Sequence, residues 1–122
     1  MWLNLPPAVR IYVATAPTDM RKSFDGLSAA VSHVLERDPF AGHLFVFFNR
    51  RRDLMKSLVW DGSGYWLMCK RLEHGRFKIF DRVGASRTAF ELTSTDFALL
   101  MDGIDLRGAR RRITHDEISR AS

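Results

Sequence analysis

Basic side chains gather in one segment of the sequence, and their chemistry suits the binding of an anion. Between residues 43 and 82 the chain carries nine lysines and arginines but four carboxylates, whereas the segments on either side are electrically neutral. The formal net charge of +5 therefore resides in this segment. A concentrated positive field on a small domain attracts polyanions. We predict nucleic-acid binding by Arg50, Arg51, Arg52, Lys56, Lys70, Arg71, Arg76 and Lys78.

The titratable residues support a catalytic function less well than the basic residues support anion binding. Asp61, Glu73 and Asp81 could hold Mg²⁺ as in a two-metal nuclease, but a predicted strand separates Asp61 from Glu73 by roughly 20 Å. Two-metal chemistry needs ions only about 4 Å apart. The four histidines have no metal-ligand spacing to a cysteine or carboxylate, and Cys69, the single cysteine, has no candidate partner base. We predict that the protein is not an enzyme and has no catalytic residue, cofactor or metal site.

Three aromatic residues flank the sequence Asp-Gly-Ser-Gly at positions 61–64, which is typical of a hairpin turn. Trp60, Tyr65 and Trp66 could stack on unpaired bases. Aromatic side chains beside a hairpin turn more commonly pack against each other across the two strands. We favour the packing interpretation.

The apolar pattern predicts the elements that position these residues. We expect strands at residues 11–14, 43–48, 54–60, 65–71 and 76–80, with residues 43–48 in the centre of the sheet. A helix is predicted to begin near Thr18, which can cap it. Its apolar face would contain Met20, Phe24, Leu27, Val31, Val34 and Leu35. A second, short helix follows a capping sequence at residues 93–96.

An up-and-down arrangement of these strands would gather the basic residues. Alternate turns of a meander lie at the same end, so loop 49–53 should adjoin turn 72–75. If Trp60 faces Tyr65, the register continues to Lys56 opposite Cys69 and Leu54 opposite Arg71. Arg71 would then face Arg76 on a fifth strand. Lys56, Arg71, Arg76 and Lys78 would share an exposed face with Leu58, Trp60, Tyr65 and Leu67, and the core face would hold Met55, Val59, Trp66, Met68, Phe77 and Ile79.

Composition and pattern together predict a single α+β domain. We expect an antiparallel β-meander of four to five strands packed with one amphipathic helix, plus a short C-terminal helix. The domain would span residues 1–106, followed by a basic, disordered tail at residues 107–122. One cysteine excludes an internal disulfide and fits a reducing compartment. The opening residues lack the pattern of a signal peptide and no apolar run could span a bilayer, so we predict a cytoplasmic protein without a membrane partner.

Several motifs resemble those of one protein family. They include Leu5-Pro6-Pro7, the run from Pro17 to Leu27, the run from Asp38 to Phe47, Trp60-Asp61-Gly62-Ser63-Gly64, the run from Lys70 to Phe77, and Gly103-Ile104-Asp105. In this order and spacing the chain resembles the TnpB-type accessory protein, the second open reading frame, of bacterial insertion-sequence-66 family transposons. Residues 78–81 depart from the family, which tends to have a Trp-Pro pair there, and Leu106 stands where it tends to have Trp.

The resemblance implies a role in DNA transposition beside a separate, larger transposase. It implies no known catalytic residue in this chain. We therefore expect a non-enzymatic accessory protein whose basic sheet end binds DNA, the transposase, or both. The alternative is a protein-only adaptor without direct DNA binding, and a nuclease is the least favoured reading. The run from Arg107 to Arg112 is the other dense basic stretch. The sequence leaves the oligomeric state open.

Overall fold

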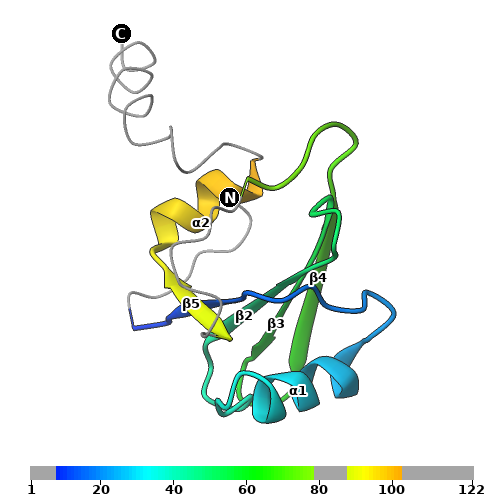
Figure 1. Cartoon of the computed structure of the whole chain (residues 1–122). Coiled ribbons are helices and arrows are strands. Elements are labelled where there is room, and N and C mark those ends of the chain that lie inside the picture. The colour runs from blue at the N-terminus through cyan, green and yellow to red at the C-terminus, as the bar shows by residue number, and fades with distance from the viewer. Residues whose placement is uncertain (1–7, 79–87, 103–122) are drawn as a thin grey trace, which may run out of the picture.

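The computed structural model describes residues 8–78 and 88–102, which form a five-stranded sheet and two helices (Figure 1). The elements are β1 (Ile11–Ala14), α1 (Phe24–His33), β2 (Leu44–Phe48), β3 (Leu54–Trp60), β4 (Tyr65–Arg71), β5 (Ala89–Leu92) and α2 (Ser94–Met101). The strand order is β4-β3-β2-β1-β5. The predicted α+β class is confirmed. The predicted tail at residues 107–122 lies outside the described residues.

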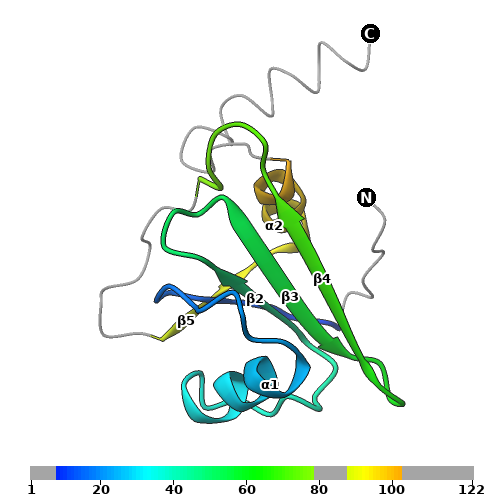
Figure 2. The same ribbon diagram turned by 90° about the vertical axis from the view of Figure 1, so that its right-hand side faces the viewer.

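The sheet forms a central layer with a helix on each face (Figure 2). All five residues of β2 are buried, which confirms its predicted central position. Both faces of the sheet therefore bury apolar side chains, and this corrects the expectation that one face is exposed. Neither described helix is long and apolar enough to cross a membrane.

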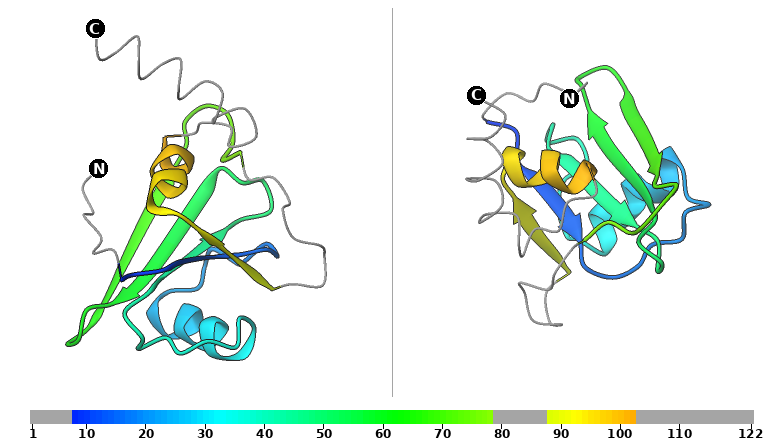
Figure 3. Two further views of the ribbon diagram at one scale, coloured as in Figure 1. Left: turned by 90° about the vertical axis from the view of Figure 1, so that its left-hand side faces the viewer. Right: turned by 90° about the horizontal axis from the view of Figure 1, so that it is seen from above.

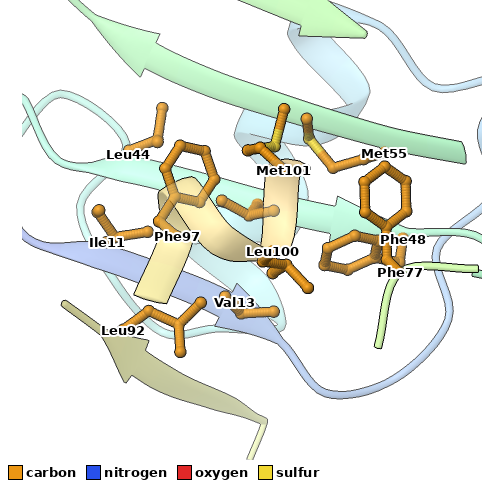
Figure 4. Packing of buried hydrophobic residues seen from close by; sticks show 11 residues of the cluster. Ile11, Val13, Leu44, Phe48, Met55, Phe77, Leu92, Phe97, Leu100 and Met101 are labelled. Atoms are coloured by element: carbon orange, nitrogen blue, oxygen red, sulfur yellow. The ribbon is translucent and has the colours of Figure 1, made fainter. Parts of the chain in front are cut away.

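One apolar cluster lies between α2 and the sheet (Figure 4). Phe97 and Leu100 of α2 are fully buried against Met55 and the neighbouring strands. Phe77 joins the cluster from beyond β4, and its ring centroid lies 5.2 Å from that of Phe48. Phe77 thereby ties the segment after β4 to the core.

The second apolar cluster lies under α1. Leu27 and Val31 of α1 pack against Phe45, Phe47 and Leu58 of the sheet, and all five are buried. Leu27 and Val31 are four residues apart, so they project from the same face of the helix. This side of the sheet carries the residues that were expected to form an exposed aromatic face.

The sheet is mixed, and among the described strands only β2, β3 and β4 form a meander. β1 pairs with β2 in parallel, with α1 as the crossover between them, and β5 lies antiparallel on the other side of β1. The predicted fifth strand at 76–80 is not a strand over residues 76–78, and its remainder lies outside the described residues. The strand that does complete the sheet was not predicted, because its partner lies almost eighty residues earlier in the chain.

α1 begins six residues later than the predicted cap. The Thr18 N–H donates to the Phe48 carbonyl (2.8 Å), so residue 18 is attached to the end of β2. The Asp19 carboxylate accepts bonds from the backbone and side chain of Arg21, which stabilises a turn instead of a helix. Phe24 in the first turn and Val34 just after the helix are 45% and 53% exposed, so their assignment to the apolar face was wrong. The predicted burial of Leu27, Val31 and Leu35 is confirmed.

α2 begins where its capping sequence predicts. The Thr93 side chain accepts a hydrogen bond from the Asp96 N–H (3.0 Å), which satisfies one of the unpaired donors of the first turn.

Candidate nucleic-acid interface

The hairpin of β3 and β4 has the predicted register. Trp60 faces Tyr65, Lys56 faces Cys69 and Leu54 faces Arg71. The turn at residues 61–64 is closed by the Asp61 carboxylate, which accepts from the N–H groups of Ser63 and Gly64. The hairpin therefore carries Arg71 to the end of the sheet opposite this turn.

The loop after β2 and the segment after β4 lie side by side, as the sequence predicts. The Leu72 N–H donates to the Asp53 carbonyl (2.8 Å), and the Phe77 N–H donates to the Arg52 carbonyl (2.6 Å). These two bonds attach the segment after β4 to the loop after β2, one near the start of that segment and one near its end. Because Phe77 is also buried, the backbone that carries Arg76 and Lys78 is held against the arginine loop.

The arginine loop itself has a defined conformation. The Asn49 side-chain oxygen accepts from the N–H groups of Asp53 and Leu54, and its amide donates to the Asp53 carboxylate (2.7 Å). This bond is the main cause of a lowered pKa at Asp53, to which Arg51 contributes. Arg52 adopts a left-handed backbone conformation with φ of 59°. The loop therefore closes around Asn49 and leaves its three arginines exposed.

Six exposed cations meet at this end of the sheet, which we call the basic end: Arg50, Arg51, Arg52, Arg71, Arg76 and Lys78. Of the carboxylates in the described part of the chain, two lie among them. Asp53 is 3.8 Å from Arg51, and Glu73 is 3.6 Å from Arg71. Six cations outnumber these two carboxylates, so the basic end has a net positive charge. Exposed ion pairs such as these are also weak, so both arginines can exchange their partner for another anion.

Two lysines assigned to the site donate to backbone carbonyls on opposite sides of the sheet. The Lys56 ammonium donates to the Lys22 carbonyl (2.7 Å) on the α1 side of the sheet. The Lys70 ammonium donates to the Met101 carbonyl (2.6 Å) at the C-terminus of α2, on the other side. Each lysine thus has a structural partner, and the two point away from each other.

Aromatic rings gather at the far end of the same hairpin. Phe40 lies 5.0 Å from Trp60 and 5.7 Å from Tyr65 between ring centroids, and Trp60 lies 5.0 Å from Tyr65. The predicted packing of Trp60 on Tyr65 is confirmed. Trp66 was expected in the core but is 61% exposed, and its indole N–H donates to Asp61 (2.9 Å). Sequence reasoning missed Phe40, which follows a proline in a loop and has no periodic pattern.

A cavity of about 260 Å³ lies beyond the end of β1, beside α1. Asp19 and Lys22 are its charged lining residues among those described. Asp19 is already bonded to Arg21, which lowers its pKa from 3.8 to about 2. In the described parts of the chain, no group of three or more histidines, cysteines and carboxylates is placed to hold a metal ion. The cavity therefore offers less recognisable chemistry than the basic end.

Comparison with known proteins identifies relatives of this chain. The sequence matches the model of a family described as IS66 Orf2 like protein over residues 9–111. It is 40% identical over 104 residues to the uncharacterized protein y4jC of Sinorhizobium fredii, a match that covers 85% of this chain and 86% of the relative. It is 39% identical over 99 residues to y4hO of the same organism, covering 81% and 84%. No solved structure matches significantly.

Proposed function

Because the chain belongs to the IS66 Orf2-like family, we propose that it is a non-enzymatic accessory protein of transposition that binds DNA through its basic end. Family membership itself implies an accessory role in transposition. The observation that carries the DNA-binding proposal is that six exposed cations lie at one end of the sheet, on the loop after β2, the last residue of β4 and the segment after β4.

The chemistry of the basic end suits phosphate more than base edges. Guanidinium groups match phosphate oxygens with two parallel hydrogen bonds, and five of the six cations are arginines. Readout of the major groove usually needs an inserted helix or a two-stranded ribbon, whereas the basic end consists of loop residues and the last residue of β4. We therefore expect binding that tolerates changes of sequence and depends strongly on salt.

Fluorescence anisotropy with two labelled duplexes, a transposon end and an unrelated sequence, tests the proposal at several salt concentrations. Replacing Arg50, Arg51 and Arg52 by alanine should weaken binding to both duplexes about equally. The slope of log K against log salt should flatten by about 0.9 for each phosphate that the variant no longer neutralises.

A matched control removes the same charge elsewhere. The triple substitution of Arg10, Arg21 and Arg37 by alanine also lowers the net charge by three, but at exposed positions outside the basic end. It should leave the salt slope close to that of the wild-type protein. Equal losses of affinity in the two triple variants would show that overall charge, and not the basic end, controls binding.

The remaining alternatives predict other results. A protein-only adaptor would show no salt-sensitive affinity for DNA even at low ionic strength, while the transposase would still co-purify with it. Binding that survives the arginine triple but disappears on deletion of residues 107–122 would move the site to the tail.

A further inference from the structure

β4 forms an edge of the sheet that the described residues leave uncovered (Figures 2 and 3). All seven of its residues pair one-to-one with β3, so the strand has no bulge, and it contains no proline. Bulges, prolines and outward charges are the usual means by which proteins prevent an edge from pairing with another strand. Five consecutive residues of β4, Tyr65 to Cys69, carry no charge. This edge is therefore suited to accept a further strand.

The hydrogen bonds of the hairpin show which backbone groups face outward. The Asp61 N–H donates to the Gly64 carbonyl at one end, and the Leu72 N–H donates to the Asp53 carbonyl at the other. Bonded and non-bonded pairs alternate along an antiparallel ladder. The backbone groups of Trp66, Met68 and Lys70 consequently point toward β3. Those that point to the free edge belong to Tyr65, Leu67, Cys69 and Arg71.

We propose that β4 pairs antiparallel with β4 of a second copy of this chain, about a two-fold axis at Met68. This register is the one that uses every outward-facing residue of both strands. It places Tyr65 opposite Arg71, Trp66 opposite Lys70, Leu67 opposite Cys69, and Met68 opposite its own copy. The outward-facing pairs exchange backbone hydrogen bonds, and the two sheets join into one.

In this register each cation of β4 lies opposite an uncharged aromatic residue and not opposite a like charge. The exposed ring of Trp66 lies opposite Lys70 in a non-bonded pair, where facing side chains are closest. A cation against an indole face is a favourable contact. Lys70 is already ordered by its bond to the Met101 carbonyl, so little further ordering is needed. A parallel pairing would instead bring Lys70 and Arg71 against their own copies, which favours the antiparallel dimer.

The dimer would hold its two basic ends at opposite ends of the joined strands, which keeps the two positive fields apart. A single pair of strands is a small interface, so we expect dissociation constants in the micromolar range. The inference rests on the edge and register of β4 and does not depend on DNA binding.

Cys69 reports directly on this geometry because it is exposed and is the only cysteine of the chain. In the proposed register the two copies of Cys69 are diagonal neighbours, about 7–8 Å apart. A short bis-maleimide should therefore yield a covalent dimer at micromolar protein, and Cys69→Ser should yield none. Sedimentation as a monomer up to hundreds of micromolar, without cross-linking, would overturn the proposal.

A pair of substitutions at Trp66 tests the register. Both Trp66→Glu and Trp66→Lys remove the ring and its bond to Asp61. Glutamate would face Lys70 of the second copy as an ion pair, whereas lysine would face a like charge. We expect the dissociation constant of the lysine variant to exceed that of the glutamate variant about tenfold. Within one chain, lysine at position 66 would lie near the carboxylate of Asp61, whereas glutamate would lie near a like charge, so the lysine variant should fold more stably. A folding defect therefore cannot produce the larger dissociation constant expected of the lysine variant. Equal constants would refute the register.

A backbone substitution tests the edge itself. Cys69→Pro removes a donor that faces outward and leaves the bonds to β3 intact, a position that proline tolerates. We expect Cys69→Pro to be a folded monomer by circular dichroism and sedimentation, with Cys69→Ser still dimeric. A dimer that persists in Cys69→Pro would place the interface elsewhere. A monomeric wild-type protein that instead gains a strand from another protein would assign the edge to a different partner.

Discussion

Arg52 combines a strained backbone with a charge at the proposed binding surface, so its two roles can be separated. Its left-handed conformation costs a non-glycine residue roughly 1–2 kcal/mol. We expect Arg52→Gly to be at least as stable as the wild-type protein in urea unfolding, yet weaker in binding DNA.

Arg51→Gly provides the control, because Arg51 is not among the described residues with positive φ. It loses the same charge but gains no relief of strain, so glycine should lower stability by about 0.5–1 kcal/mol. If Arg52→Gly were the less stable of the two variants, the conformation of the loop would be misassigned.

Asp61 should titrate below its ordinary pKa of 3.8. The N–H groups of Ser63 and Gly64, then the indole of Trp66, bond its carboxylate and lower the pKa. Folding therefore favours the ionised form. Its contribution to stability is complete above pH 3.8 and is lost as the pH falls through the folded-state pKa.

An NMR titration of the Asp61 carboxyl carbon checks this pKa. Trp66→Phe removes the indole donor and should raise the value part of the way back, because the two backbone bonds remain. A midpoint at or above 3.8 in the wild-type protein would contradict the bonding of the turn.

Local residue patterns predicted the turns and caps well where the partner lies nearby in sequence. The glycines and Asp61 define the hairpin turn, and Thr93 caps α2 through a bond to a residue only three positions later. The prediction of a helix cap at Thr18 failed because the backbone of Thr18 bonds to Phe48, thirty residues away. The partners of Lys56 and Lys70 are likewise distant, so these two bonds could not be seen in the sequence.

At the scale of the element, substitutions at different positions of α1 should lower the stability of the protein by different amounts. Leu27 is fully buried between α1 and the sheet, so Leu27→Ala should cost about 2–5 kcal/mol. Phe24 is 45% exposed on the first turn, and Phe24→Ala should cost about 1 kcal/mol or less. Chemical denaturation of the two variants measures the difference. Equal losses of stability would show that Phe24 is buried in solution.

The C-terminus of α2 should depend on Lys70. Its ammonium bonds the Met101 carbonyl, where a cation also complements the helix dipole. We expect Lys70→Met to lower stability by about 1 kcal/mol and to leave the affinity for DNA unchanged.

Lys78→Met gives the reverse test, because Lys78 is exposed at the basic end. Its stability should match the wild-type protein, while its affinity for DNA falls. A loss of affinity in Lys70→Met equal to that in Lys78→Met would restore Lys70 to the binding surface.

The elements themselves were predictable to different degrees. The bounds of β3 and β4 follow from two mostly apolar runs on both sides of one strong turn. β5 is four residues long and pairs with β1, so neither its length nor its neighbours in sequence mark it. Phe77 and its neighbours are β-prone, yet Phe77 serves as a buried anchor in an irregular segment.

At the scale of the whole molecule, the rates of amide hydrogen exchange should increase from the centre of the sheet to its edge. Amides of the central β2 should exchange slowest, because both neighbouring strands and both helices cover them. In dilute protein, β4 should show alternation, with Trp66, Met68 and Lys70 slow and Leu67, Cys69 and Arg71 fast. Mass spectrometry or NMR resolves this pattern. Uniformly slow exchange along β4 in the dilute monomer would mean that another segment covers its edge.

The class of the fold followed from the sequence, but the mixed sheet did not. A parallel pair with a helical crossover was not apparent, because β1 is only four residues long. Its apolar run fits a parallel or an antiparallel neighbour equally well. Charge segregation, by contrast, was visible in the sequence because it depends on composition along the chain.

The position of β1 between β2 and β5 has a consequence for synthesis on the ribosome. β1 is made early, but its second neighbour is translated about eighty residues later. At 5–20 residues per second this interval lasts roughly 4 to 16 seconds. During that time the nascent chain carries an apolar strand with at least one edge unpaired, which is the kind of segment that chaperones bind. Slow translation between residues 14 and 89 should therefore increase aggregation of the emerging chain, whereas a pause before residue 11, where β1 has not yet been made, should not.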